Sequence, residues 1–283
     1  MLATNRGGPG LSGGRGDLLR FAALDVAMPA GREVGGLPLG PDGFGLAAAT
    51  RLDAAGLTAA LRGPEEPVIW IHGYNNNAAE AVYRQAQLAE DLALSGPQIS
   101  FVWPSAGRYV GYMHDRDSVL QARGPTQTLL RMVAARTARP PLVLAHSMGG
   151  FLAMEVLRDA RQAGQPLDKA IGTLVLIQPD VDLDVFLAQA RAAAPLPPMA
   201  VVTRRDDVVL RLSARLAGRR ERLGSTSDRA AIEALGIRTL DLTGVGDSAV
   251  DHLSVLTSPS VLAFIRALRA GRADLPMDGV PDL

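Results

Sequence analysis

Short apolar runs alternate with longer segments of helical pattern from residue 68 onwards. Each run is continuous rather than alternating, which is typical of parallel strands covered on both faces. The runs are VIWI (68–71), ISFVW (99–103), LVLA (142–145), TLVLI (173–177), MAVVT (199–203) and IRTLDL (237–242). The segments between them predict helices at about 78–95, 118–136, 149–163, 183–193 and 208–217, with a last helix at about 253–270.

This βαβ rhythm predicts an α/β fold: a mostly parallel, twisted sheet with helices on both faces and right-handed crossovers. Residues 18–60 mix apolar runs with Gly and Pro turns, and we expect short strands there, forming a hairpin at the sheet edge. Residues 1–17 are Gly-rich and polar and predict a flexible tail. A single domain is expected over 18–270, followed by a loose end at 271–283.

Composition narrows the function classes. The 29 basic and 29 acidic residues balance, so nothing favours nucleic-acid binding. The chain has no cysteine, which excludes disulfides, a cysteine nucleophile and cysteine-ligated zinc. No ligand cluster suggests a metal or an organic cofactor. No apolar stretch is long enough to span a membrane, and the first residues do not resemble a secretory signal, so we expect a cytoplasmic protein. The pattern does not indicate an oligomeric state.

Ser147 is the candidate nucleophile. It lies in AHSMGG, directly after the run at 142–145 and directly before a helical segment. A G-x-S-x-G elbow needs this strand–turn–helix context, because the strained turn pushes the serine hydroxyl out above the sheet. Ala145 stands where the motif has its first Gly, a sterically plausible departure. A serine that merely caps the following helix is the alternative.

The oxyanion donors follow from the same fold. The strand at 68–71 is followed by HGYNNN, whose Gly73 permits a turn and whose Tyr74 or Asn75 would present a backbone amide. The residue after the nucleophile, Met148, would present the second amide. The Asn-rich loop also suits the start of the next helix, and both roles are compatible.

The candidate base is His252. Of the four histidines, it alone lies late enough for the order Ser, acid, His, and its imidazole suits proton transfer near neutral pH. An exposed loop histidine is the alternative. We expect His146 to point away from the serine, His72 to shape its loop and His114 to face solvent or the rim of the site.

The candidate acid follows the strand at 199–203, in the sequence RRDDVV. Either Asp206 or Asp207 could orient the imidazole, and we favour Asp207. The other aspartate would cap a helix or pair with a neighbouring arginine. Asp180 and Asp182, which follow the strand at 173–177, are a further alternative, although such residues more often cap the next helix.

Taken together, IHGYNNN, FVWPSAGRYVGY, AHSMGG, IQPDVDLDVF and DDVVLRLS resemble the uncharacterised bacterial α/β-hydrolase family DUF900. The resemblance covers about residues 18–268. It implies an α/β-hydrolase fold, the triad Ser147, Asp207 and His252, and oxyanion amides near Tyr74 and Met148, but no substrate. Many members begin with an export or lipoprotein signal, and this sequence shows none.

These features predict a serine hydrolase that acts on a small acyl substrate, of carboxylesterase type. A thioesterase, lipase, acyltransferase or peptidase on the same elements is the alternative, as is a non-catalytic binding protein that kept the fold. The stretch from Trp103 to His114, with Ser105, Tyr109 and Tyr112, forms either a rim or lid over the pocket or an ordinary packed loop.

Overall fold

A nine-stranded sheet forms the centre of the computed structural model, which describes residues 1–8, 11–216, 218, 220–244 and 258–269. The strands are β1 (Leu2–Gly7), β2 (Gly14–Ala27), β3 (Gly45–Leu52), β4 (Val68–Ile71), β5 (Gln98–Val102), β6 (Leu142–His146), β7 (Thr173–Ile177), β8 (Met199–Thr203) and β9 (Arg238–Asp241). The helices are α1 (Ala54–Ala60), α2 (Ala78–Asp91), α3 (Tyr112–Ala134), α4 (Met148–Gln162), α5 (Leu183–Ala193), α6 (Val208–Leu216), α7 (Arg229–Glu233) and α8 (Pro259–Arg269), with 3₁₀ turns η2 (Tyr109–Gly111) and η3 (Leu223–Ser225).

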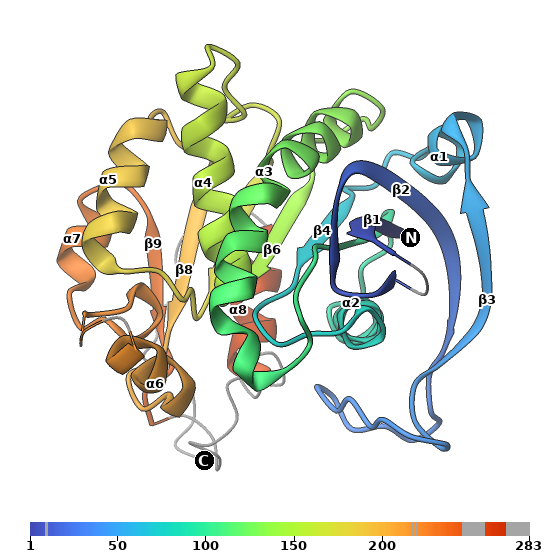
Figure 1. Cartoon of the computed structure of the whole chain (residues 1–283), viewed down its shortest axis with the longest axis horizontal. Helices are drawn as coiled ribbons and strands as arrows, with labels where there is room; N and C mark the ends of the chain where they lie inside the picture. Colours follow the sequence, from blue (N-terminus) through green and yellow to red (C-terminus); the bar gives the residue numbers. More distant parts are fainter. Residues whose placement is uncertain (9–10, 217, 219, 245–257, 270–283) are drawn as a thin grey trace.

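The sheet order is β3-β2-β1-β5-β4-β6-β7-β8-β9. Strands β1 and β4 to β9 run parallel, while β2 lies antiparallel between β1 and β3. In Figure 1, β2 and β3 are the two long curved strands on the right. The predicted fold class is therefore confirmed, and strands do pair at the sheet edge, although β2, with 14 residues, is longer than the short strands expected there.

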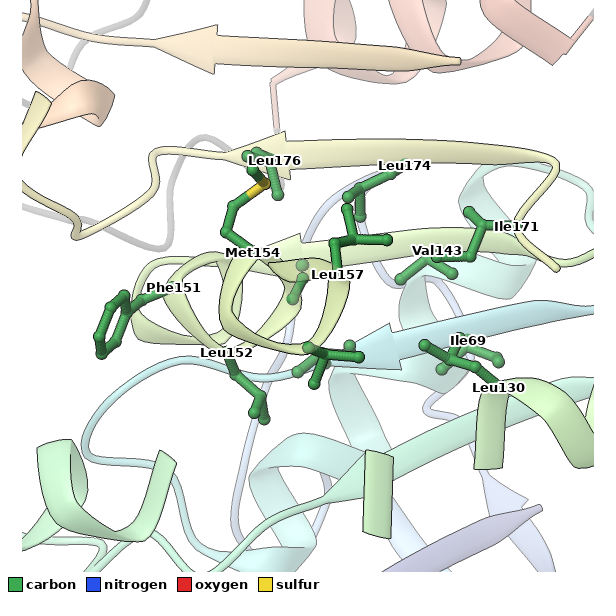
Figure 2. Close-up of a cluster of buried hydrophobic side chains, with 14 of the residues drawn as sticks. Ile69, Leu130, Val143, Phe151, Leu152, Met154, Leu157, Ile171, Leu174 and Leu176 are labelled. Atoms are coloured by element: carbon green, nitrogen blue, oxygen red, sulfur yellow. The ribbon is translucent and has the colours of Figure 1, made fainter. Parts of the chain in front are cut away.

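Helices cover both faces because successive strand residues point to opposite sides. Ile69 and Val143 point into the core under α3, α4 and α5, whereas Trp70 and Leu144 pack against α2 and α8 on the opposite face. Figure 2 shows α4 lying along the strands, with Leu152 and Leu157 directed into the core on the side of α3, α4 and α5. Burial on both faces explains why the strand sequences read as continuous apolar runs.

The chain reverses direction across the sheet beside β4. It passes from β4 outward to β5 and then returns through α3 to β6, which lies on the other side of β4. The loop after β4 therefore leads to one side of the sheet, toward β5, and the loop after β6 leads to the other side, toward β7. The two loops separate between the neighbouring strands β4 and β6. In open α/β sheets such a switch point is where ligands bind.

The expectation of a flexible tail over residues 1–17 is wrong. Leu2–Gly7 forms β1, which is inserted between β2 and β5, and β2 already begins at Gly14. Polar residues are accommodated there because neighbouring strands and α3 satisfy them: the Thr4 hydroxyl donates to the Val102 carbonyl (2.6 Å), and the Asn5 amide donates to Gln121 (3.0 Å). Gly16 permits close strand approach, since a Cβ there would lie 2.9 Å from the Asn5 carbonyl oxygen.

Some predicted helix boundaries shift. Helix α3 begins at Tyr112, six residues before the expected start, and α2 ends at Asp91 rather than 95. The expected last helix is described from Pro259 to Arg269, and its earlier part lies outside the described residues. The loose end expected at 271–283 also lies outside them.

Leu152→Ala tests the core on the side of α3, α4 and α5. Leu152 lies on α4 and its side chain is fully buried, so its truncation to alanine removes packing contacts and leaves a cavity. We expect the free energy of unfolding to fall by about 2–5 kcal/mol, measured by urea unfolding followed by circular dichroism. Leu120→Ala on α3 is the control, because that side chain is 43% exposed and its loss should change stability by less than about 1 kcal/mol. Equal losses in both variants would contradict this account of the core.

Candidate active site

Ser147 occupies a strained turn between β6 and α4. Its backbone has φ 53° and ψ −122°, a region that residues other than glycine rarely adopt. Three hydrogen bonds hold the turn. The Ser147 amide donates to the Ile177 carbonyl (3.0 Å), and the Ser147 carbonyl accepts from the amides of Gly150 (3.0 Å) and Asp180 (3.1 Å). Ser147 occupies the N-cap position of α4, but its side chain makes no capping hydrogen bond to the helix.

Two glycines let the strands and α4 approach this turn. A Cβ on Gly149 would lie 2.5 Å from the carbonyl oxygens of both Ile71 and His72. A Cβ on Gly73 would lie 2.8 Å from the Ser147 Cβ and 2.9 Å from His146 Nδ1. Gly149 after the serine and Gly73 after β4 are therefore both required by the close packing between β4 and the β6–α4 turn.

The two buried histidines of the site have structural positions. His72 stacks on Trp103 at 4.8 Å between ring centroids, and its Nδ1 lies 2.8 Å from the Gly73 carbonyl oxygen. Burial, with the nearby Arg6 charge, lowers the pKa of His72 to about 3, so this imidazole stays neutral at neutral pH. His146 is buried against the Trp70 ring at 6.1 Å. As expected, His72 shapes its loop.

Asp115, near the start of α3, fastens the loop after β4. Its carboxylate accepts hydrogen bonds from the backbone amides of Asn75 (3.1 Å) and Ala106 (2.6 Å) and from the Ser105 hydroxyl (2.7 Å). The side chain is fully buried. Asn75 has φ 58°, and its amide is directed at Asp115. One carboxylate thus holds two loops together beside the turn at Ser147.

Further polar contacts fix the Asn-rich segment. The Asn76 amide donates to the Ser105 hydroxyl (3.2 Å), and the Arg6 guanidinium donates to the Asn76 carbonyl (2.9 Å). Asn77 caps α2 and forms a reciprocal capping box with Glu80. The loop is therefore both a helix start and a rigid presenter of backbone groups at the sheet edge.

The two adjacent aspartates after β8 have different surroundings. Asp207 is 2% exposed; its Oδ2 accepts from the Gln178 side chain (2.6 Å) and its Oδ1 from the Leu210 amide (2.9 Å). Asp206 is one third exposed and pairs with Arg204 (2.8 Å), whose hydrogen bond lowers the pKa of that carboxyl. Gln178 follows β7, which lies between β6 and β8, so it joins Asp207 to the strand beside the serine.

The aspartates after β7 have structural partners. Asp180 is buried and accepts hydrogen bonds from Tyr112 (3.0 Å) and Ser213 (2.8 Å) while pairing with the buried Arg222 (3.2 Å). Burial, and then the Asp180 charge, raises the pKa of Tyr112 to about 12. Asp182 caps α5 through the Val185 amide (3.2 Å), as expected for an aspartate before a helix.

The stretch from 103 to 114 divides into a buried and an exposed part. Trp103 and Ser105 are fully buried, so they pack the loop rather than form a rim. Tyr109 is 85% exposed on η2. Its backbone carbonyl accepts a hydrogen bond from the Tyr74 hydroxyl, which connects η2 to the loop after β4. His114 lies partly exposed against Asp115 (3.3 Å). His252, the expected base, lies outside the described residues.

No helix in the described ranges combines the length and the apolar character that crossing a membrane requires. Within the same ranges, no three His, Asp or Glu side chains gather into a group that could hold a metal ion.

With the strained serine, its glycine packing and the loop at the switch point in place, the family can be assigned. The model of DUF900, described as "alpha/beta hydrolase of unknown function", matches residues 57–270. The chain belongs to this family. The matched range contains every expected triad residue and the loop after β4, so the resemblance inferred from the sequence motifs is confirmed from residue 57 onwards; the expected match over residues 18–56 lies outside the range.

Solved structures with a similar fold include carboxyl esterase 2 from the fungus Tuber melanosporum, at 15% identity. That comparison covers 88% of this chain and 85% of the other, with a TM-score of 0.47. Dienelactone hydrolase from Anabaena variabilis is 11% identical, with 89% and 95% covered and a TM-score of 0.46. A putative hydrolase from Agrobacterium vitis is 14% identical, with 92% and 96% covered and a TM-score of 0.43. No curated protein matches the chain.

Sequence reasoning did not single out Asp115 and Gln178 as site residues. Asp115 lies in the charged stretch HDRD, where it is indistinguishable from the exposed Asp117 except by its helical phase. Gln178 directly follows the apolar run of β7, which is the position where strand-end side chains should be inspected, so a signal for it was present.

Asp115→Asn tests the anchoring of the loop after β4. Asparagine would replace one acceptor oxygen by an amino group, so at least one of the Asn75, Ser105 and Ala106 donors would be left buried without an acceptor. We expect the free energy of unfolding to fall by about 1–3 kcal/mol, measured by urea unfolding. Asp117→Asn, on the same helix with its side chain 65% exposed, should change it by less than about 1 kcal/mol. An unchanged free energy of unfolding in Asp115→Asn would contradict the anchoring role.

Proposed function

We propose that this α/β-hydrolase is a serine hydrolase that transfers an acyl group first to Ser147 and then to water. The observation that carries the proposal is the backbone of Ser147. Ser147 has a positive φ on a strand–turn–helix beside the switch point, and its hydroxyl makes no capping hydrogen bond to the helix it precedes. Strain of this kind persists where surrounding contacts impose it, and it is concentrated at functional sites.

Asp207 is the proposed acid, and its surroundings support the choice over its neighbour. Asp207 is buried, and its hydrogen bond with Gln178 joins it to the segment after β7, the strand beside the one that leads to the serine. Asp206 is partly exposed to solvent and forms an ion pair with Arg204. Asp180 is engaged by Tyr112, Ser213 and Arg222, and Asp182 by the start of α5.

His252 is the proposed general base. In sequence it lies between β9, whose carboxyl end is at the same sheet edge as the serine, and α8. Neither buried histidine near the serine competes for this role: His72 is held neutral against Trp103, and His146 is packed against Trp70. The imidazole of His252 would therefore carry the proton between serine, leaving group and water.

The proposed oxyanion donors are the backbone amides of Tyr74 and Met148. The Asn75 amide donates to Asp115, so among the two amides considered after Gly73 the geometry favours Tyr74. Met148 is the first residue of α4, where the helix dipole adds to the donor strength of its amide. Asp115 would act at one remove, by holding the loop that carries the Tyr74 amide.

The proposed reaction has two steps. The Ser147 oxygen attacks the substrate carbonyl while His252 takes the hydroxyl proton, and collapse of the tetrahedral intermediate breaks the bond to the leaving group, which receives that proton. Water then attacks the acyl-enzyme, His252 takes its proton, and the Ser147 oxygen leaves with it. Asp207 stabilises the imidazolium in both steps.

An ester of a carboxylic acid is the proposed substrate class, because an alcohol leaving group needs less assistance from the site than the amine of a peptide does. Thioesters, peptides and acyl transfer to an alcohol use the same steps and differ in the pocket. A panel of p-nitrophenyl esters, acyl thioesters and peptide anilides, assayed with the purified chain, separates these activities.

Ser147→Ala should abolish labelling by a fluorophosphonate probe and turnover of p-nitrophenyl esters, because the nucleophilic oxygen is removed. Labelling is read by in-gel fluorescence. Ser95→Ala, in an exposed loop, is the control and should label like the unaltered protein. Labelling that persists in Ser147→Ala but is absent from another serine variant would place the nucleophile elsewhere.

Asp207→Asn should lower kcat by on the order of 10³–10⁴-fold with little change in KM, because asparagine cannot stabilise the imidazolium. Asp206→Asn should lower kcat by less than about threefold, since that carboxylate faces Arg204. Both are measured by steady-state hydrolysis of a p-nitrophenyl ester. The reverse order of effects would assign the acid to Asp206.

A further inference from the structure

A groove of about 460 Å³ lies away from Ser147, between α2 and the curved antiparallel part of the sheet. Its walls are mostly apolar: Leu2 on β1, Leu24 on β2 and Val82 on α2 contribute, together with Ala49 on β3. Grooves of roughly 300–1,000 Å³ accommodate small organic ligands. None of its lining residues belongs to the proposed triad or oxyanion hole.

The groove follows from how the hairpin curves. Leu2 and Ala22 face one another across β1 and β2, and Leu24 faces Ala49 across β2 and β3. The first turns of α2 pack on this face at β1, whereas β2 and β3 curve past the helix, as Figure 1 shows. The small side chains of alanines on β2, β3 and α2 leave the space between these elements open.

The charge of the groove has one sign. Arg20 and Arg51 are its charged lining residues, and no Asp or Glu is among the described residues that line it. Arg51 lies opposite Ala22, two residues from Arg20, so the two arginines are diagonal neighbours on one face. Arg20 donates one hydrogen bond to the Arg6 carbonyl, and Arg51 forms no ion pair within the described part of the chain.

We propose that this groove binds an anionic amphiphile with a single hydrocarbon chain. The apolar walls would cover the chain, and Arg20 and Arg51 would bind the carboxylate or phosphate head group with charge-assisted hydrogen bonds. Both arginines are exposed, so their guanidinium groups are accessible to an anionic head group. This site is independent of the chemistry at Ser147.

Binding is tested with dodecanoate below its critical micelle concentration, by titration calorimetry on the full chain. We expect dodecanoate to bind at least about tenfold more tightly than dodecanol, which lacks the charge. Butanoate should not bind detectably, because most of the apolar contact is removed. Dodecyl phosphate distinguishes a general anion site, which binds both anions, from one specific for carboxylate.

Two sets of variants locate the site. Arg20→Gln with Arg51→Gln should reduce dodecanoate affinity by about tenfold and leave dodecanol affinity unchanged, whereas Arg136→Gln, in the exposed turn after α3, should change neither. Ala49→Phe should fill the groove and remove binding of both probes. Ala48→Phe is the matched control, because the neighbouring strand residue points to the opposite face and should leave binding intact.

The proposal fails if dodecanoate does not bind, or if it binds equally well to Ala49→Phe and the unaltered protein, since the ligand would then lie elsewhere. It also fails if the chain is a dimer in size-exclusion chromatography and Ala49→Phe makes it monomeric, because the groove would then bind a second copy. Fluorophosphonate labelling of Ser147 should be the same in all these variants, so the outcome is separate from that of the proposed hydrolase activity.

Discussion

The close backbone contact between β4 and the turn at Ser147 is the constraint on which the rest of the site depends. Gly149 lies so near the carbonyl groups of Ile71 and His72 that no Cβ fits, and Gly73 lies equally near Ser147. Because α4 is held this tightly over β4, the strained serine cannot relax into an ordinary helix start. The side chains of Leu152 and Leu157 continue the same packing along α4 (Figure 2).

Buried polar groups transmit this constraint to the surrounding loops. Asp115 joins the loop after β4 to the loop after β5, and Asp180 joins the segment after β7 to α3, α6 and Arg222. Each carboxylate is fully supplied with donors, which is the condition for a buried charge to be tolerated. The apolar core thus sets the position of the strands, while two aspartates set the position of the loops between them.

Much of this was accessible from the sequence because it is encoded locally. Strands β4 to β9 are apolar runs and the strand–turn–helix at Ser147 is a contiguous motif, so both were predicted to within about a residue. Strand β1 was missed because four of its six residues are Gly or polar, and because the partners that bury it on β5 and α3 lie far along the chain. The choice between Asp206 and Asp207 needed the fold, since only burial and the contact with Gln178 separate two adjacent carboxylates.

The strained backbone of Ser147 lowers the stability of the fold. Holding a residue other than glycine at φ 53° and ψ −122° costs on the order of 1–3 kcal/mol, a sizeable share of the stability of an ordinary domain. Glycine would adopt the turn without that cost, but it has no hydroxyl. At the proposed nucleophile the chain is therefore less stable than it could be, and the proposed function sets stability against reactivity at a single residue.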